Sequence, residues 1–78
     1  QETITRSPQR SSAWIGLGNL ALARQDDQRA IGFYKKAFQV DPRNFIAPYN
    51  LALTYRRIGD IEKAQYFENI ARQLQQQP

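Results

Sequence analysis

The sequence predicts an all-α chain built of antiparallel helical hairpins. Apolar residues recur at helical spacing along most of the 78 residues, and no alternating strand pattern competes with them. The chain also matches itself when it is shifted by 34 residues. We expect helices near 12–24, 27–40, 45–58 and 61–75, joined by short turns.

The first two expected helices each carry one apolar face. On 12–24 this face consists of Trp14, Leu17, Leu20 and Ala21. On 27–40 it consists of Ala30, Phe33, Tyr34 and Ala37. Asp26 is a natural N-cap for the second of these helices, and the chain breaks again at Pro42.

The third and fourth expected helices follow the same plan. The helix at 45–58 requires Pro48 to lie in its first turn, where a missing N–H is tolerated. Gly59 suits the left-handed residue just past a helix end, and Asp60 suits the cap of the next helix. The apolar face of 61–75 consists of Ala64, Phe67, Ile70, Ala71 and Leu74.

Small residues recur in one place per helix when the two halves are aligned. The aligned pairs include Ala13 with Ala47, Leu17 with Leu51, Gly18 with Ala52, Ala30 with Ala64 and Ala37 with Ala71. We expect Ala30 to let its helix approach Leu17 and Gly18, and Ala37 to let the next hairpin approach. The residues expected to fill the wedge between hairpins are Phe33, Tyr34 and Phe38.

This pattern resembles the tetratricopeptide repeat, a 34-residue helix–turn–helix with Trp, Leu-Gly, Tyr, Ala, Phe, Ala and a closing Pro. Repeat 11–44 offers Trp14, Leu17, Gly18, Ala30, Tyr34, Ala37 and Pro42. Repeat 45–78 offers Leu51, Ala52, Tyr55, Gly59, Ala64 and Ala71. Residues 1–10 fit the tail of a preceding repeat or an N-terminal extension, with Pro8 in the closing place. The resemblance implies hairpins stacked as a short right-handed α-solenoid.

Several positions depart from the family pattern. Ala21 replaces the usual Tyr, Gln25 the usual Gly, and Pro48 stands where Trp14 stands one repeat earlier. Glu68 stands where Tyr34 does, so the second repeat looks terminal, and the polar tail QLQQQP is expected to fray. Because about three repeats are usually needed for stability, we expect marginal stability or weak self-association through an exposed end of the stack.

Composition excludes several classes of function. Without Cys or His, thiolate and imidazole metal sites, a Cys nucleophile and a His base are absent. The adjacent Asp26 and Asp27 are explained as helix cap and dipole partners. We therefore expect no enzyme activity, no metal and no cofactor. No membrane span or signal peptide is evident, which favours a soluble protein, with the cytoplasm preferred and the redox compartment undecided.

The surface left for function is the inner, concave face of the first helix of each repeat. The residues expected to project into this predicted groove are Ser12, Ile15, Gly16, Asn19, Leu22, Ala23, Ile46, Tyr49, Asn50, Leu53, Arg56 and Arg57. Carboxamides can hold a peptide backbone because they both donate and accept hydrogen bonds, and the arginines favour an acidic group. The sequence therefore predicts a protein–protein interaction module that binds a peptide-like, acidic segment of a partner.

The sequence allows three alternatives to this interpretation. Some tetratricopeptide repeats clamp a chaperone's C-terminal carboxylate with Lys, Asn, Asn, Lys and Arg, but Ile15 stands where the first Lys would be beside Asn19 and Asn50. A net charge of +4 permits nucleic-acid binding, yet the basic residues are scattered. The chain could also be a purely structural segment of a longer superhelix.

Overall fold

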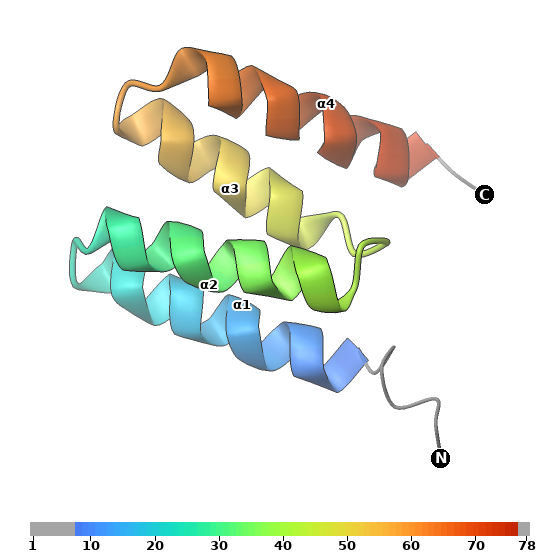
Figure 1. Cartoon of the computed structure of the whole chain (residues 1–78), viewed down its shortest axis with the longest axis horizontal. Coiled ribbons are helices and arrows are strands. Elements are labelled where there is room, and N and C mark those ends of the chain that lie inside the picture. Colours follow the sequence, from blue (N-terminus) through green and yellow to red (C-terminus); the bar gives the residue numbers. More distant parts are fainter. Residues whose placement is uncertain (1–7, 77–78) are drawn as a thin grey trace.

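The computed structural model describes residues 8–76, which form four α-helices joined by short turns and contain no strand. Helix α1 spans Pro8–Ala23, α2 Asp27–Val40, α3 Ile46–Arg57 and α4 Ile61–Gln76. The helices follow one another in chain order, and successive helices run antiparallel (Figure 1). The predicted all-α hairpin architecture is confirmed. The expectations for residues 1–7 and for the last two residues of the tail lie outside the described residues.

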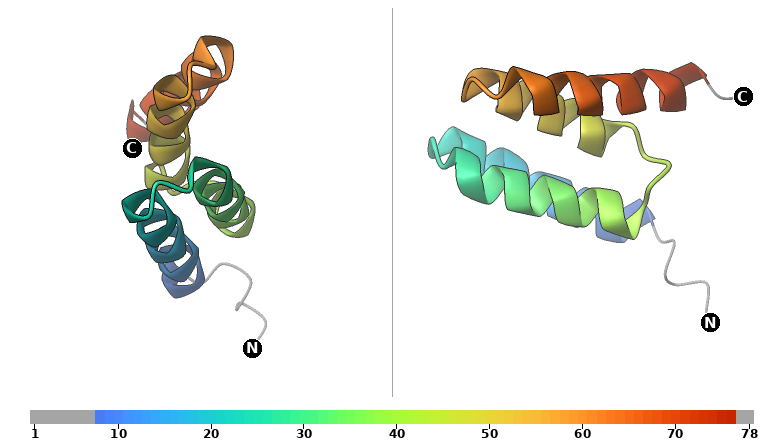
Figure 2. Two further views of the ribbon diagram at one scale, coloured as in Figure 1. Left: turned by 90° about the vertical axis from the view of Figure 1, so that its left-hand side faces the viewer. Right: turned by 45° about the horizontal axis from the view of Figure 1, so that its top comes forward.

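The two hairpins stack through their middle helices. Helix α2 packs against both α1 and α3, and α3 packs against α4. The turn at 41–45 connects the hairpins at one end of the stack (Figure 2, right-hand view). The principal extents are 41 × 28 × 13 Å, so the molecule is a slab in which α1 and α4 form the two ends.

Helix α1 begins at Pro8, so the predicted start near residue 12 is wrong. Proline is favourable at the first position of a helix, where the N–H would have no intrahelical partner. Residues 8–10, expected in the tail of a preceding repeat, therefore form the first turn of α1. The bounds of the other helices agree with the prediction within one residue.

The predicted caps are confirmed. The Asp26 carboxylate accepts a hydrogen bond from the Arg29 backbone N–H at 3.2 Å, and Asp60 accepts one from the Lys63 N–H at 3.3 Å. Gly59 has a φ of 92°, the left-handed conformation that ends α3. Gln25, which stands one repeat earlier, adopts the same region with a φ of 63° at a higher conformational cost.

Pro48 lies in the first turn of α3, as its chemistry requires. The first helical hydrogen bond of α3 is donated by the next residue, Tyr49, to the Phe45 carbonyl at 3.0 Å. Proline at this position therefore removes no bond from the helix. Its side chain is fully buried, where it takes the place that Trp14 has in the first hairpin.

The close approach between α1 and α2 is made by an aromatic ring against a glycine. A Cβ on Gly18 would lie 2.5 Å from a ring carbon of Tyr34, whose side chain is fully buried. Ala30 is also fully buried, as expected, whereas Leu17 remains 42% exposed.

The aromatic residues divide between the hairpins in a way that periodicity does not predict. Phe33 stacks on Trp14, with ring centroids 6.0 Å apart, and Tyr34 lies against Gly18, so both act within the first hairpin. Phe38 reaches the second hairpin, where its ring meets Phe67 at 6.4 Å. The predicted wedge between hairpins is thus confirmed for Phe38, whereas the ring contacts of Phe33 and Tyr34 lie within the first hairpin.

Candidate functional site

Helix α3 presents a stripe of large apolar side chains to solvent. Ile46, Tyr49 and Leu53 are 41%, 49% and 49% exposed and stand at helical spacing on one face. Their side chains lie outside the hydrophobic core, although their types are those that proteins usually bury. All three belong to the predicted groove.

Helix α1 contributes a more polar surface. Ser12, Gly16, Asn19 and Ala23 are exposed, and Leu22 is partly buried against the core. Ile15 is only 9% exposed and belongs to the core, so it offers little surface to a ligand. Of the predicted apolar contacts, those on α3 are accessible and Ile15 is not.

Asn19 is held in place by a residue from the neighbouring helix. The Tyr34 hydroxyl of α2 donates a hydrogen bond to the Asn19 Oδ1. Burial raises the pKa of the Tyr34 phenol, so it keeps its proton and remains a donor. The Asn19 amide oxygen is therefore occupied, and its NH₂ group is left to donate. No sequence pattern indicates this bond, because it joins residues from two different helices.

Asn50 of α3 is partly buried, and its own carbonyl accepts a hydrogen bond from the Thr54 hydroxyl at 2.8 Å. This bond stays within the backbone turn of α3 and leaves the Asn50 side chain uninvolved. The two carboxamides of the predicted groove thus differ, since Asn19 is fixed by Tyr34 and Asn50 has no such partner within residues 8–76.

Both arginines of the predicted groove are engaged in ion pairs. The Arg56 Nη2 lies 3.1 Å from the Glu68 Oε1 of α4, and both side chains are about half exposed. The Arg57 Nε lies 3.4 Å from the Asp27 Oδ1 of α2, which is itself a buried oxygen. Arg57 therefore joins the second hairpin to the first as well as contributing charge.

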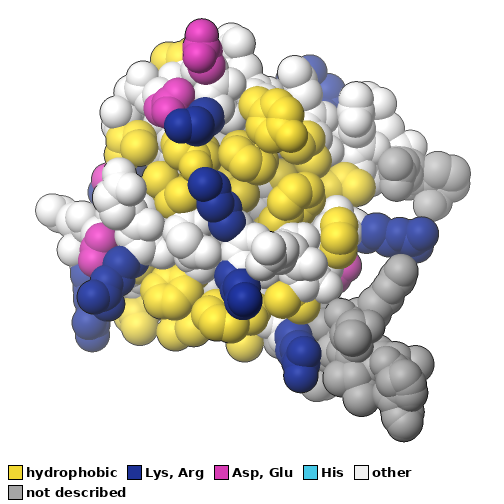
Figure 3. Space-filling view, in the orientation of Figure 1, with side chains coloured by type: hydrophobic (Ala, Val, Ile, Leu, Met, Phe, Trp, Pro, Cys, Tyr) yellow, Lys and Arg dark blue, Asp and Glu magenta, His cyan; other side chains and the backbone are white. Residues whose placement is uncertain are grey.

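On the face shown in Figure 3, the basic side chains do not form one patch, because hydrophobic and uncharged side chains separate them. Several are already neutralised by neighbours, since Arg29 pairs with Asp26 at 3.5 Å and Lys63 with Asp60 at 3.4 Å. A phosphate backbone is bound by a continuous basic surface, and this face does not offer one.

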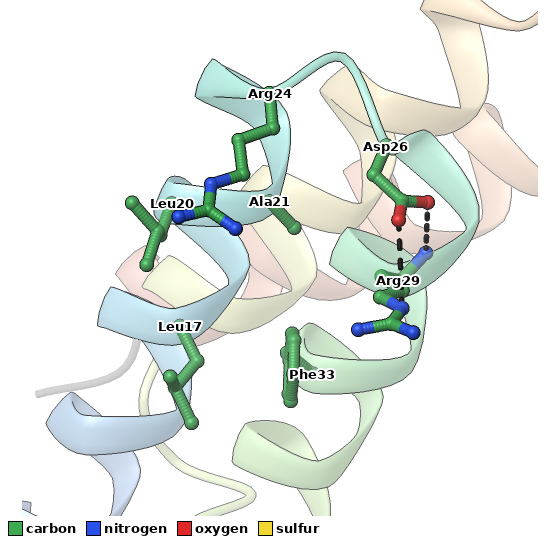
Figure 4. Close-up of a pocket in the computed structure, with 7 residues that line it drawn as sticks. All are labelled: Leu17, Leu20, Ala21, Arg24, Asp26, Arg29 and Phe33. Carbon is green, nitrogen blue, oxygen red and sulfur yellow. Dashed lines mark hydrogen bonds and ion pairs between the residues drawn. The ribbon is translucent and has the colours of Figure 1, made fainter.

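A shallow pocket of about 200 Å³ lies on a different part of the molecule. Leu17 and Leu20 of α1 and Phe33 of α2 are among the residues that line it (Figure 4). The other residues that line it are Ala21, Arg24, Asp26 and Arg29. None of the lining residues belongs to the predicted groove, and no feature of the sequence distinguished this pocket from the core.

Within residues 8–76, no helix is both long enough and apolar enough to cross a membrane.

Comparison with known protein families gives two overlapping matches. Both family models describe the tetratricopeptide repeat, one matching residues 11–44 and the other residues 33–66. The matched region contains the Gly18–Tyr34 contact, the stack of α2 on α3 and the exposed stripe of α3. Such repeats generally act as scaffolds for protein–protein interaction. This chain belongs to the tetratricopeptide repeat family.

Proposed function

We propose that the chain binds a peptide-like segment of a partner protein on the surface shared by α1 and α3, with 11–44 and 45–78 as its two repeats. The observation that carries the proposal is the α3 stripe of Ile46, Tyr49 and Leu53, each about half exposed. Exposed large apolar side chains that stand together are a common mark of a binding surface.

The hydrogen-bonding groups beside the stripe support an extended or helical peptide as ligand. The Asn19 NH₂ can donate to a peptide carbonyl without first losing another bond, because Tyr34 already occupies the amide oxygen. This fixed orientation lowers the entropy lost when a ligand docks. Asn50 is free to turn its amide toward either a donor or an acceptor of the ligand.

Charge supports a modest preference for acidic ligands. Arg56 is half exposed and pairs with a half-exposed carboxylate, so a carboxylate on the ligand can share its guanidinium. Arg57 is more constrained, because its partner Asp27 contributes a buried oxygen that needs a cation nearby. We expect Arg56, rather than Arg57, to respond to the charge of the ligand.

The test compares two exposed tyrosines, one on the α3 stripe and one on α4, outside the proposed binding surface. Tyr49 of α3 is 49% exposed and Tyr66 of α4 is 62% exposed. Wild type, Tyr49→Ala and Tyr66→Ala would be used to capture proteins from nuclease-treated extract, after circular dichroism has shown that all three are folded. A partner held by wild type and Tyr66→Ala but lost by Tyr49→Ala supports the proposal. Equal capture by all three proteins, or capture from untreated extract that disappears after nuclease treatment, would overturn it.

Weak self-association through the exposed ends of the stack is the second candidate. It is supported by the exposure of Ile61 and Tyr66, which are 46% and 62% exposed on α4, at the end of the slab opposite α1. Sedimentation equilibrium of the chain alone measures it directly, and a monomer at all concentrations used would exclude it.

A further inference from the structure

The outer side of α1 carries an apolar face that the rest of the described chain leaves uncovered. We call it the α1 end face, and it consists of Ala13, Leu17, Leu20 and Arg24, with Phe33 of α2 beside it. Leu17 and Leu20 are 42% and 52% exposed. The pocket of about 200 Å³ lies between these leucines and Phe33.

The second hairpin shows what kind of element covers such a face. One repeat later, Ala47, Leu51 and Thr54 stand in place of Ala13, Leu17 and Leu20, and they are at most 1% exposed. In the first hairpin, α2 does not cover Ala13, Leu17 and Leu20. Helix α4 is the equivalent of α2 in the second hairpin, so it does not account for the burial of the corresponding residues of α3. The cover on α3 is therefore the preceding hairpin, and the helix that packs against α3 from that side is α2.

The same comparison indicates that the covering helix carries a negative charge in its first turn. Asp27, in the first turn of α2, reaches Arg57 at the end of α3. One repeat earlier, the position of Arg57 is held by Ala23, and the next residue is Arg24. Arg24 has no ion-pair partner among residues 8–76. A carboxylate in the first turn of a covering helix would lie beside the Arg24 guanidinium, where the helix dipole also favours it.

A second copy of this chain fits the α1 end face poorly. Head-to-tail stacking would bring α4 onto it, and α4 carries Gln65 and Arg72 where α2 carries Ile31 and Phe38. In an antiparallel pair of α1 helices centred on Leu17, Arg24 would meet Arg10 of the other copy. Both arrangements are energetically unfavourable, the first because it buries polar groups and the second because it brings like charges together.

We propose that the α1 end face binds an amphipathic helix of a partner protein, with large apolar side chains along one stripe and a carboxylate in its first turn. The apolar stripe would bury Leu17 and Leu20, and the carboxylate would pair with Arg24. This site is separate from the α1–α3 surface of the proposed function, with which it shares no residue.

Helix α2 itself supplies the probe. A synthetic peptide of residues 26–41, with blocked ends, carries the aromatic stripe, the Asp26 cap and the acidic first turn. Titrated into the ¹⁵N-labelled chain, it is expected to shift the amide signals of 13–24 and to leave those of 46–53 in place. A peptide with Asp27→Lys is expected to bind less tightly and with a weaker dependence on salt.

Two leucines of similar exposure provide the matched control. Leu20→Glu on α1 should weaken peptide binding by about tenfold or more, because it removes one well-buried apolar contact. Leu53→Glu on α3, whose parent side chain is 49% exposed against 52% for Leu20, should leave peptide binding unchanged. Both variants alter solvent-exposed side chains, so both are expected to fold.

Three results would overturn the proposal. The first is an absence of saturable binding at peptide concentrations up to about 1 mM, where even weak complexes form. The second is a shift pattern confined to 46–53 or a loss of binding in Leu53→Glu instead of Leu20→Glu. The third is a dimer of the chain alone that Leu20→Glu converts to a monomer, which would assign the face to a second copy.

Discussion

At the scale of single residues, the contact between Gly18 and Tyr34 decides how closely α1 and α2 approach. A methyl group on Gly18 would overlap a fully buried ring that has no room to move, so Gly18→Ala should lower the free energy of unfolding by about 1–3 kcal/mol. Gly16 is the control on the same helix, because nothing lies within 4 Å of its Cβ position. Gly16→Ala should raise stability by up to about 1 kcal/mol through helix propensity. Urea denaturation followed by circular dichroism measures both, and equal effects would contradict the predicted overlap.

The Tyr34 hydroxyl makes stability depend on alkaline pH. Its pKa is raised above 10.0 in the folded protein by burial, so the unfolded chain loses this proton first as the pH rises. The stabilisation is fully present below the unfolded pKa and is lost as pH rises past it. Tyr34→Phe should cost about 0.5–1.5 kcal/mol at neutral pH, because Asn19 loses its hydrogen bond.

The difference in stability between wild type and Tyr34→Phe should shrink as the pH is raised through 10.0 and beyond. Thermal unfolding of the two proteins in parallel removes the contribution of the other tyrosines and the lysines, which both proteins share. A difference that stays constant with pH would contradict the assigned role of the phenol.

At the scale of helices, the pair Arg57–Asp27 ties the end of α3 to the start of α2. It should be worth more than the exposed pair Arg56–Glu68, because the Asp27 oxygen is buried and would lose its cation. Double-mutant cycles with Arg→Ala and acid→amide substitutions should give about 1 kcal/mol for Arg57–Asp27, toward the top of the range of exposed pairs. Arg56–Glu68 should give about 0.3 kcal/mol and should vanish in high salt. The reverse order would show that the burial of Asp27 does not matter.

At the scale of the whole molecule, the middle helices α2 and α3 each pack against two neighbours, whereas the end helices α1 and α4 each pack against one. We expect amide hydrogen exchange to be slowest in α2 and α3, and faster by about tenfold in α1 and α4. Total stability should be about 5 kcal/mol or less, as befits a small core. Exchange measured by NMR reports each helix separately, and uniform protection would mean that the four helices unfold as one unit.

The sequence predicts local features of this fold better than it predicts which faces are covered. Caps at Asp26 and Asp60, the left-handed Gly59 and the placement of Pro48 all follow from backbone chemistry within a few residues. The exposure of Leu17 does not, because periodicity marks an apolar face without showing whether a neighbour lies on it.

The candidate site shows the same difference between features that follow from the local sequence and features that depend on contacts between helices. The exposed α3 stripe follows from helical spacing, which predicts that Ile46, Tyr49 and Leu53 are accessible. The burial of Ile15, the bond from Tyr34 to Asn19 and the pair Arg57–Asp27 depend on contacts between separate helices. Such contacts are fixed by the angle and depth of helix packing, which a single sequence does not specify.

The glycine and the ring that meet between α1 and α2 have a further consequence for how this chain can be rebuilt. In the second hairpin Ala52 stands in place of Gly18, and Glu68 stands in place of Tyr34, so both members of the pair have changed. An α3 sequence transplanted into the position of α1 would bring a methyl group against the tyrosine ring. An α1 sequence transplanted into the position of α3 would place a glycine where α4 has no aromatic ring, and a gap would remain between the two helices. The unit that can be exchanged or duplicated is therefore the hairpin as a whole, and neither of its helices alone.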